Sequence, residues 1–122
     1  AAGAKGILLT EDCADIYNSK TVRSAMGGLY HMPFFSATRE KLLDYLHQYH
    51  YKIYLADAKG VSYKECNLNF PLCFVLGNEA NGLHNFWQKS REEKIAIPQM
   101  PNVESLNVAI ACGILLFAAK KD

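Results

Sequence analysis

Two polar loops, each directly after an apolar run, hold the residues of this sequence that could do chemistry. The first loop, residues 77–82 (GNEANG), follows Phe74-Val75-Leu76 and carries two glycines, two asparagines and one carboxylate. Glycines let a backbone approach a ligand closely, and the neutral amides suit a flat, polar ligand without strong negative charge. This composition favours contact with a group such as an adenosine moiety.

The first loop does not match the usual phosphate-binding loops. Its two glycines have the G-x-x-x-x-G spacing of a P-loop, but Leu83 and His84 follow where Lys and Ser or Thr would contact phosphate and magnesium. The G-x-G-x-x-G pattern also fails, because Asn78 and Glu79 come directly after Gly77. The sequence therefore argues against a triphosphate site and against a Rossmann dinucleotide site.

The second loop, residues 98–107 (PQMPNVESLN), follows the apolar run Ile95-Ala96-Ile97. Two prolines stiffen it, and four polar residues gather just before the most apolar helix predicted in the chain: Asn102, Glu104, Ser105 and Asn107. Taken alone, this loop is explained by Ser105 as a helix cap beside a solvated turn. Two such loops late in the chain, each after a buried strand, favour a shared site.

The elements that must position these loops alternate along the chain. We predict strands at residues 6–10, 52–57, 72–76 and 95–97, an extended piece at 33–35, and helices at 18–29, 38–49, 84–92 and 105–120. Thr38 is the predicted N-cap of its helix, and residues 58–70 are predicted to be irregular. Strands alternating with helices predict an α/β fold with a mainly parallel sheet, whose ligands bind beyond the carboxyl ends of the strands.

Bulk properties restrict the function only weakly. The 122 residues predict one domain, and a net charge of +1 neither favours nor excludes a nucleic-acid partner. The four cysteines contain no C-x-x-C pair, and two of them lie inside apolar runs, which predicts a reducing compartment: the cytoplasm, with an organelle as the alternative. No apolar run approaches the roughly 18 residues of a membrane span, and no signal peptide is recognisable.

No metal site is predicted. His47 and His50 are three residues apart at the end of the predicted helix, but no third ligand lies near them in the sequence. A solvated helix face is the expected place for both histidines.

Three segments carry a resemblance to a known family. They are DIYNSKTVRSAMGGLYHMPFF (15–35), FVLGNEANGL (74–83) and IAIPQMPNVESLNVAIACGILLFA (95–118). In order and spacing they are similar to the motifs of the SpoU/TrmH family, the S-adenosylmethionine-dependent RNA ribose methyltransferases of the SPOUT class. The resemblance covers nearly the whole chain.

The resemblance implies a fold, an activity and partners. The fold would be a SPOUT-type α/β domain whose C-terminal part forms a deep trefoil knot, with S-adenosylmethionine held in the knotted loops. The activity would be methylation of a ribose 2′-hydroxyl, in ribosomal RNA first and transfer RNA second. A homodimer would form through the knot region. The alternative is a non-catalytic RNA-binding or assembly subunit of the same fold.

The resemblance also implies roles for individual residues. The adenine and ribose of the cofactor would contact the backbone at Leu76, Gly77, Ile97 and Leu106, where a side chain on Gly77 would obstruct the adenosyl group. The polar positions lining the active site would be Glu79, Ser105 and Asn107. RNA contacts would fall to Arg23 and Asn18, although a surface ion pair explains Arg23 equally well and a helix cap explains Asn18 better.

One family motif has no counterpart. The first motif of the family, N-x-G-x-x-x-R-T-A, carries its main catalytic arginine and should precede AAGAKG at the start of this sequence. We therefore expect residues 1–122 to form a SPOUT domain without its first βα unit and without an N-terminal RNA-binding extension. On this interpretation the 122 residues alone are expected to be inactive.

Overall fold

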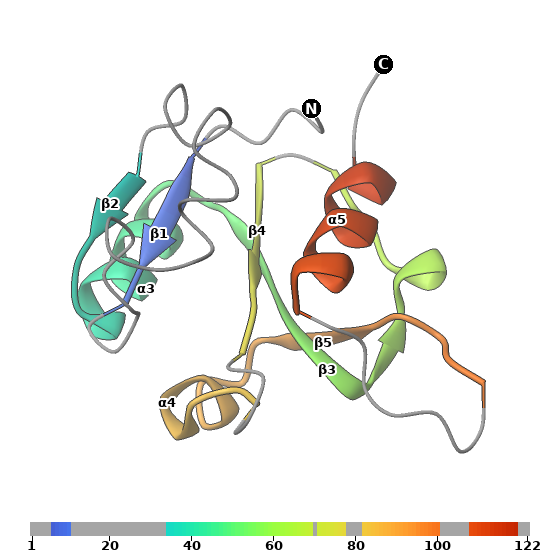
Figure 1. Ribbon diagram of the computed structural model, residues 1–122. Coiled ribbons are helices and arrows are strands. Elements are labelled where there is room, and N and C mark those ends of the chain that lie inside the picture. Colours follow the sequence, from blue (N-terminus) through green and yellow to red (C-terminus); the bar gives the residue numbers. More distant parts are fainter. Residues whose placement is uncertain (1–5, 11–33, 70, 78–81, 101–107, 120–122) are drawn as a thin grey trace, which may run out of the picture. The chain divides into compact units, whose positions relative to one another are not determined.

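The computed structural model describes residues 6–10, 34–69, 71–77, 82–100 and 108–119 of the chain (Figure 1). Apart from its first two residues, the chain divides into two compact units, Gly3–Tyr45 and Leu46–Asp122. Each unit is described by itself below. The predicted helix at residues 18–29 and the predicted start of the last helix at 105–107 lie outside the described residues.

The amino-terminal unit contains two short parallel strands and the start of a helix. Strand β1 (Ile7–Leu9) pairs with β2 (Phe34–Ser36), with Leu8 opposite Phe35. Helix α3 (Arg39–Gln48) follows, and its first turn is capped as predicted, because the backbone N–H of Lys41 donates to Thr38 Oγ1 at 3.2 Å. Both strands and the helix are thus close to their predicted positions.

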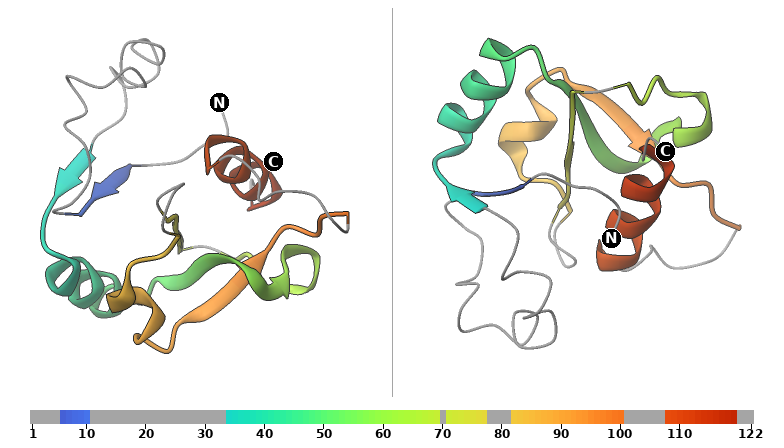
Figure 2. Two further views of the ribbon diagram at one scale, coloured as in Figure 1. Left: turned by 60° about the horizontal axis from the view of Figure 1, so that its bottom comes forward. Right: turned by 90° about the horizontal axis from the view of Figure 1, so that it is seen from above.

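The carboxy-terminal unit is built on a three-stranded parallel sheet. Strand β3 (Lys52–Ser62) lies between β4 (Leu72–Val75) and β5 (Glu93–Ala96), as Figure 2 shows. Both pairings are parallel, which confirms the predicted type of sheet. Ile53, Tyr54 and Leu55 of the central strand are each no more than 2% exposed. The apolar run of β3 is therefore the centre of this unit.

The prediction of an irregular segment at residues 58–70 is wrong in its first part. Strand β3 continues to Ser62 and leads into a 3-10 helix, η1 (Tyr63–Glu65). Ala56 and Val61 both pair with Ile95, so residues 57–60 form a bulge between two paired segments. Lys59 N–H donates to Asp57 Oδ1 at 2.8 Å within this bulge. The bulge interrupts the alternation of apolar and polar residues, and this concealed the second half of the strand.

The predicted helix at residues 84–92 is also too long. Helix α4 spans only Asn85–Gln88, and the chain turns through Arg91, whose φ is 65°. A left-handed residue cannot continue a right-handed helix. Strand β5 then begins at Glu93, two residues before its predicted start at residue 95.

Helix α5 (Val108–Ala119) completes the core of this unit. Its Leu115 forms a buried cluster with Tyr54 and Ile95, so α5 packs against the sheet. Both views of Figure 2 draw α5 beside this sheet. None of the helices among the described residues is long and apolar enough to cross a membrane.

Candidate functional site

The two strand ends that precede the polar loops converge on one hydrophobic cluster. Leu76 follows β4 and Ile97 follows β5, and both pack against the cluster of Tyr54, Ile95 and Leu115. Parallel strands place their carboxyl ends at the same edge of a sheet, which is where ligands bind in such folds. The structure thus brings together two of the predicted cofactor-binding positions that are 21 residues apart in the sequence (97 − 76).

Gly77 begins the first loop under tight steric restriction. A Cβ atom at this position would lie 2.6 Å from Gly82 O and 2.6 Å from Leu83 N, well inside van der Waals contact. The sequence interpretation explained this glycine by the approach of a ligand. The structure adds a requirement within the protein itself, because the two ends of the loop pass directly against each other.

The end of the first loop is anchored by buried apolar side chains and a helix cap. Leu83 and Trp87 are buried, and Gln88 Nε2 donates to Leu83 O at 2.9 Å. His84 caps α4, since its Nδ1 accepts a hydrogen bond from Phe86 N–H at 3.1 Å. These contacts fix the point at which the loop returns to the sheet.

A cavity of about 470 Å³ adjoins the end of β5. Its described lining comes from the bulged half of β3 and from the start of the second loop: Ala58, Gly60, Ser62, Ala96, Ile97, Pro98 and Gln99. Small and apolar side chains dominate this wall, and none of these residues is charged. An adenosyl group, with flat rings and no phosphate, fits such a wall. Sequence reasoning missed Ala58, Gly60 and Ser62, although a glycine in a polar strand pattern can signal a bulge.

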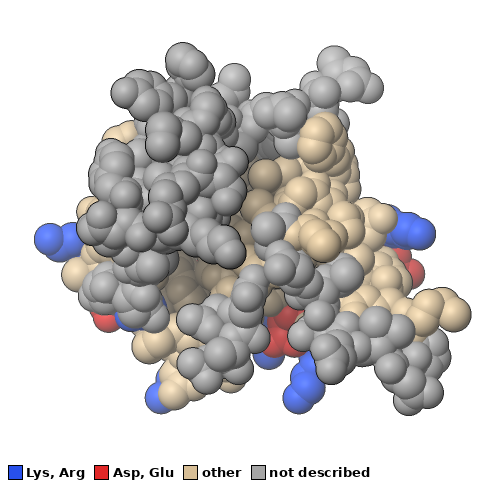
Figure 3. Space-filling model, in the orientation of Figure 1, with Lys and Arg blue, Asp and Glu red and all other residues tan. Residues whose placement is uncertain are grey.

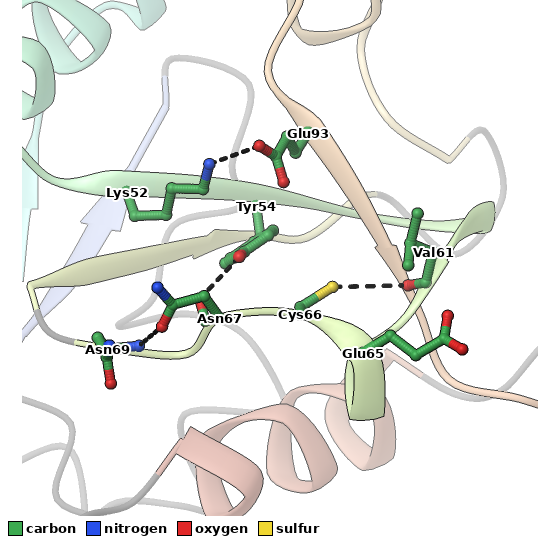
Figure 4. Close-up of a pocket in the computed structure, with 8 residues that line it drawn as sticks. All are labelled: Lys52, Tyr54, Val61, Glu65, Cys66, Asn67, Asn69 and Glu93. Carbon is green, nitrogen blue, oxygen red and sulfur yellow. Dashed lines mark hydrogen bonds and ion pairs between the residues drawn. The ribbon is translucent and has the colours of Figure 1, made fainter.

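A second cavity, of about 300 Å³, lies along the same strand and has a different character (Figure 4). Lys52 Nζ donates to Glu93 Oε1 at 2.6 Å, and this hydrogen bond raises the pKa of Lys52. The Tyr54 hydroxyl donates to Asn67 O at 2.7 Å, and burial raises the pKa of Tyr54. The ammonium group and the phenol of this cavity therefore already have partners within the protein.

The described cysteines offer no activated nucleophile. Burial raises the pKa of the Cys66 and Cys112 thiols and raises that of Cys73 to about 11. A thiol with a raised pKa stays protonated at neutral pH and reacts slowly.

Metal ligands do not gather in the described part of the chain. No group of three or more His, Cys, Asp or Glu residues there is placed to hold a metal ion. His47 lies on the exposed face of α3, as expected, and its Nε2 is 2.7 Å from Glu92 Oε1.

The remaining predicted site residues lie outside the described residues: Asn18, Arg23, Glu79, Ser105, Leu106 and Asn107. Their predicted roles stay predictions. On the face drawn in Figure 3, some of the Lys and Arg side chains of the described residues lie beside Asp or Glu.

Comparison with known proteins shows one consistent family. Residues 1–117 match the model of the SpoU rRNA Methylase family. The 23S rRNA (guanosine(2553)-2′-O)-methyltransferase RlmP of Bacillus subtilis (strain 168) is 31% identical over 118 residues, which are 96% of this chain and 48% of that protein.

Solved structures of rRNA methyltransferases are also similar to this chain. The AdoMet-bound rRNA methyltransferase from Sinorhizobium meliloti superposes with a TM-score of 0.87 and 32% identity, over 97% of this chain and 46% of that one. The SpoU methyltransferase AviRb from Streptomyces viridochromogenes, in complex with AdoMet, gives a TM-score of 0.88 and 26% identity, over 97% and 47% of the two chains. The chain spans about half the length of the relatives that it matches.

Proposed function

The chain belongs to the SpoU rRNA methylase family, and from this premise we propose that the protein methylates a ribose 2′-hydroxyl of RNA with S-adenosylmethionine. Ribosomal RNA is the proposed substrate and transfer RNA the second choice. The observation that carries the proposal is the convergence of Leu76 and Ile97 on one cluster beside an uncharged cavity. The relatives named above act on rRNA or bind AdoMet by their own descriptions.

Each part of the site has a role in this proposal. Bound S-adenosylmethionine supplies the methyl group. The backbone at Leu76, Gly77, Ile97 and Leu106 holds its adenosyl end, and the small side chains of the cavity exclude water there. The polar residues of the two loops orient the ribose hydroxyl and assist removal of its proton: Glu79, Ser105 and Asn107. Asn18 and Arg23 contact RNA.

The knot, the dimer and the location belong to the same proposal. The two loops, at residues 77–82 and 98–107, are the segments that a deep trefoil knot would bring together. Helix α5 supports a homodimer, because Ile110 and Phe117 are about half exposed on a helix of apolar residues. The proposed location is the cytoplasm. Light scattering should give a dimer at micromolar concentration, and a monomer there would contradict this part of the proposal.

A methyl-transfer assay tests the activity directly. The full protein is incubated with unmodified ribosomal RNA and S-adenosylmethionine labelled in the methyl group. We expect the label to appear in dinucleotides that survive alkaline hydrolysis, because a methylated 2′-oxygen cannot attack the adjacent phosphate. Cofactor binding without transfer to either ribosomal or transfer RNA would favour the non-catalytic alternative and refute the enzyme.

A further inference from the structure

The cavity beside Ile97 selects its ligand by shape and by a few polar groups. Its described lining is small or apolar except for Ser62 and Gln99, and no Lys, Arg, Asp or Glu is part of it. Small-molecule sites commonly combine an apolar wall with a few polar groups that fix the orientation of the ligand. The described wall therefore suits an uncharged ring system better than a phosphate group.

The two polar side chains of this cavity differ in what they already bind. Ser62 Oγ accepts a hydrogen bond from Lys64 N–H at 3.3 Å and so caps η1. Gln99 is exposed, and its carboxamide has no hydrogen-bond partner among the described residues. Pro98 immediately before it has a φ fixed by its ring, which restricts where Gln99 can lie. Among the described lining residues, Gln99 therefore has both a donor and an acceptor without a partner, whereas Ser62 already uses its hydroxyl oxygen as the cap of η1.

A glutamine carboxamide places one donor and one acceptor side by side. The N6 amino group of adenine donates and its N7 accepts, so Gln pairs with this edge through two hydrogen bonds. Hypoxanthine has a carbonyl in place of the amino group, so both of its corresponding positions are acceptors. At most one of the two hydrogen bonds then remains.

We propose that Gln99 determines the base specificity of the cofactor site by pairing with the edge of adenine in the cavity beside Ile97. The inference rests on the proposed use of S-adenosylmethionine. It also goes beyond that use. The family motifs imply backbone contacts to the adenosyl group at Leu76, Gly77, Ile97 and Leu106. Gln99 would add a side-chain contact to them. The backbone contacts would hold the ring, and Gln99 would discriminate adenine from other bases.

Calorimetry with two ligands tests this role. The ligands are S-adenosylhomocysteine and S-inosylhomocysteine, which differ in the base alone, and the protein is the full chain. We expect the wild type to bind the adenosyl ligand about tenfold more tightly, the fold-change of one lost base contact. Gln99→Ala should bring the ratio of the two Kd values close to one. Gln99→Glu keeps an acceptor for the N6 amino group but loses the donor to N7, so it should weaken the binding of both ligands and keep or increase the preference for the adenosyl ligand.

The control is Gln48→Ala. Gln48 is the exposed last residue of α3 and does not line the cavity, so this variant should keep the wild-type ratio. A folded Gln99→Ala protein with the wild-type ratio would overturn the role of Gln99 and leave the proposed function intact. A wild type that binds neither ligand would overturn the proposed function and this inference together.

Discussion

Two cavities adjoin strand β3, and they differ in what their polar groups do. The cavity that Figure 4 shows has the more polar lining, with Lys52, Glu65, Glu93 and two asparagines. Its ammonium group and its phenol are each bound to a partner inside the protein. The cavity beside Ile97 has an uncharged lining, and its exposed Gln99 has no partner among the described residues.

The difference favours the cavity beside Ile97 over the more polar one as the proposed binding site. Polar groups that already satisfy one another contribute to the fold, and a ligand would have to displace those contacts to gain its own. A polar group that has no partner among the described residues, at the edge of an apolar wall, can bind a ligand without breaking an existing hydrogen bond. This supports the proposal that the ligand binds in the cavity beside Ile97 and that the charged cavity has a structural role.

The largest effect is expected from a change in the strand that forms the wall of the Ile97 cavity. A Cβ atom on Gly60 would lie 2.7 Å from Lys94 O and Ile95 N, so Gly60→Ala must push β5 away from β3. We expect the free energy of unfolding to fall by about 1–3 kcal/mol and cofactor binding to weaken. Denaturant unfolding and calorimetry measure the two effects.

The matched control for Gly60→Ala is Gly113→Ala. An added Cβ at Gly113 meets no atom within 4 Å, and the residue lies inside α5. Alanine there should raise the free energy of unfolding by about 0.5–1 kcal/mol. Equal stability of the two variants would show that the close approach at Gly60 is not a real constraint.

A smaller effect is expected in the charged cavity. Tyr54→Phe removes the hydrogen bond to Asn67 O and should lower the free energy of unfolding by about 1 kcal/mol, with cofactor affinity unchanged. Tyr63→Phe is the control, because the Tyr63 hydroxyl has no hydrogen-bond partner among the described residues. Thermal and denaturant unfolding measure the stability. Weaker cofactor binding in Tyr54→Phe would place the charged cavity in the functional site.

The smallest effect belongs to the ion pair of Lys52 and Glu93. Both side chains are well exposed, so a double-mutant cycle with Lys52→Met and Glu93→Gln should give a coupling of about 0.2–1 kcal/mol that salt reduces. The raised pKa of Lys52 means that its contribution is complete below 10.5 and is lost only as the pH rises through the higher value in the fold. A coupling that disappears at neutral pH would contradict this pairing.

Sequence reasoning located most of the described elements, because their signals are local. Thr38 as a cap, the helical spacing after it and the apolar runs of β3, β4 and β5 need no knowledge of distant contacts. The second half of β3 could not be seen in this way. Its pairing with β5 follows a bulge at residues 57–60, and only the partner strand shows that Ala56 and Val61 occupy equivalent positions.

The candidate site was predictable where motifs or strand ends mark it. Leu76, Gly77 and Ile97 belong to two loops that a parallel sheet must place at one edge. Ala58, Gly60 and Ser62 carry no chemical signature, and they line the cavity as alternate residues of the second half of β3. Val61, between the last two, lines the charged cavity instead.

That alternation provides the most direct test of which cavity holds the cofactor. Ala58 and Val61 are both exposed residues of β3, but Ala58 lines the Ile97 cavity and Val61 lines the charged one. We would measure S-adenosylhomocysteine binding by calorimetry for Ala58→Phe and Val61→Phe, which fill one cavity each. The account predicts that Ala58→Phe abolishes binding and Val61→Phe leaves the Kd unchanged. Unchanged binding in a folded Ala58→Phe protein, or its loss in a folded Val61→Phe protein, would contradict it.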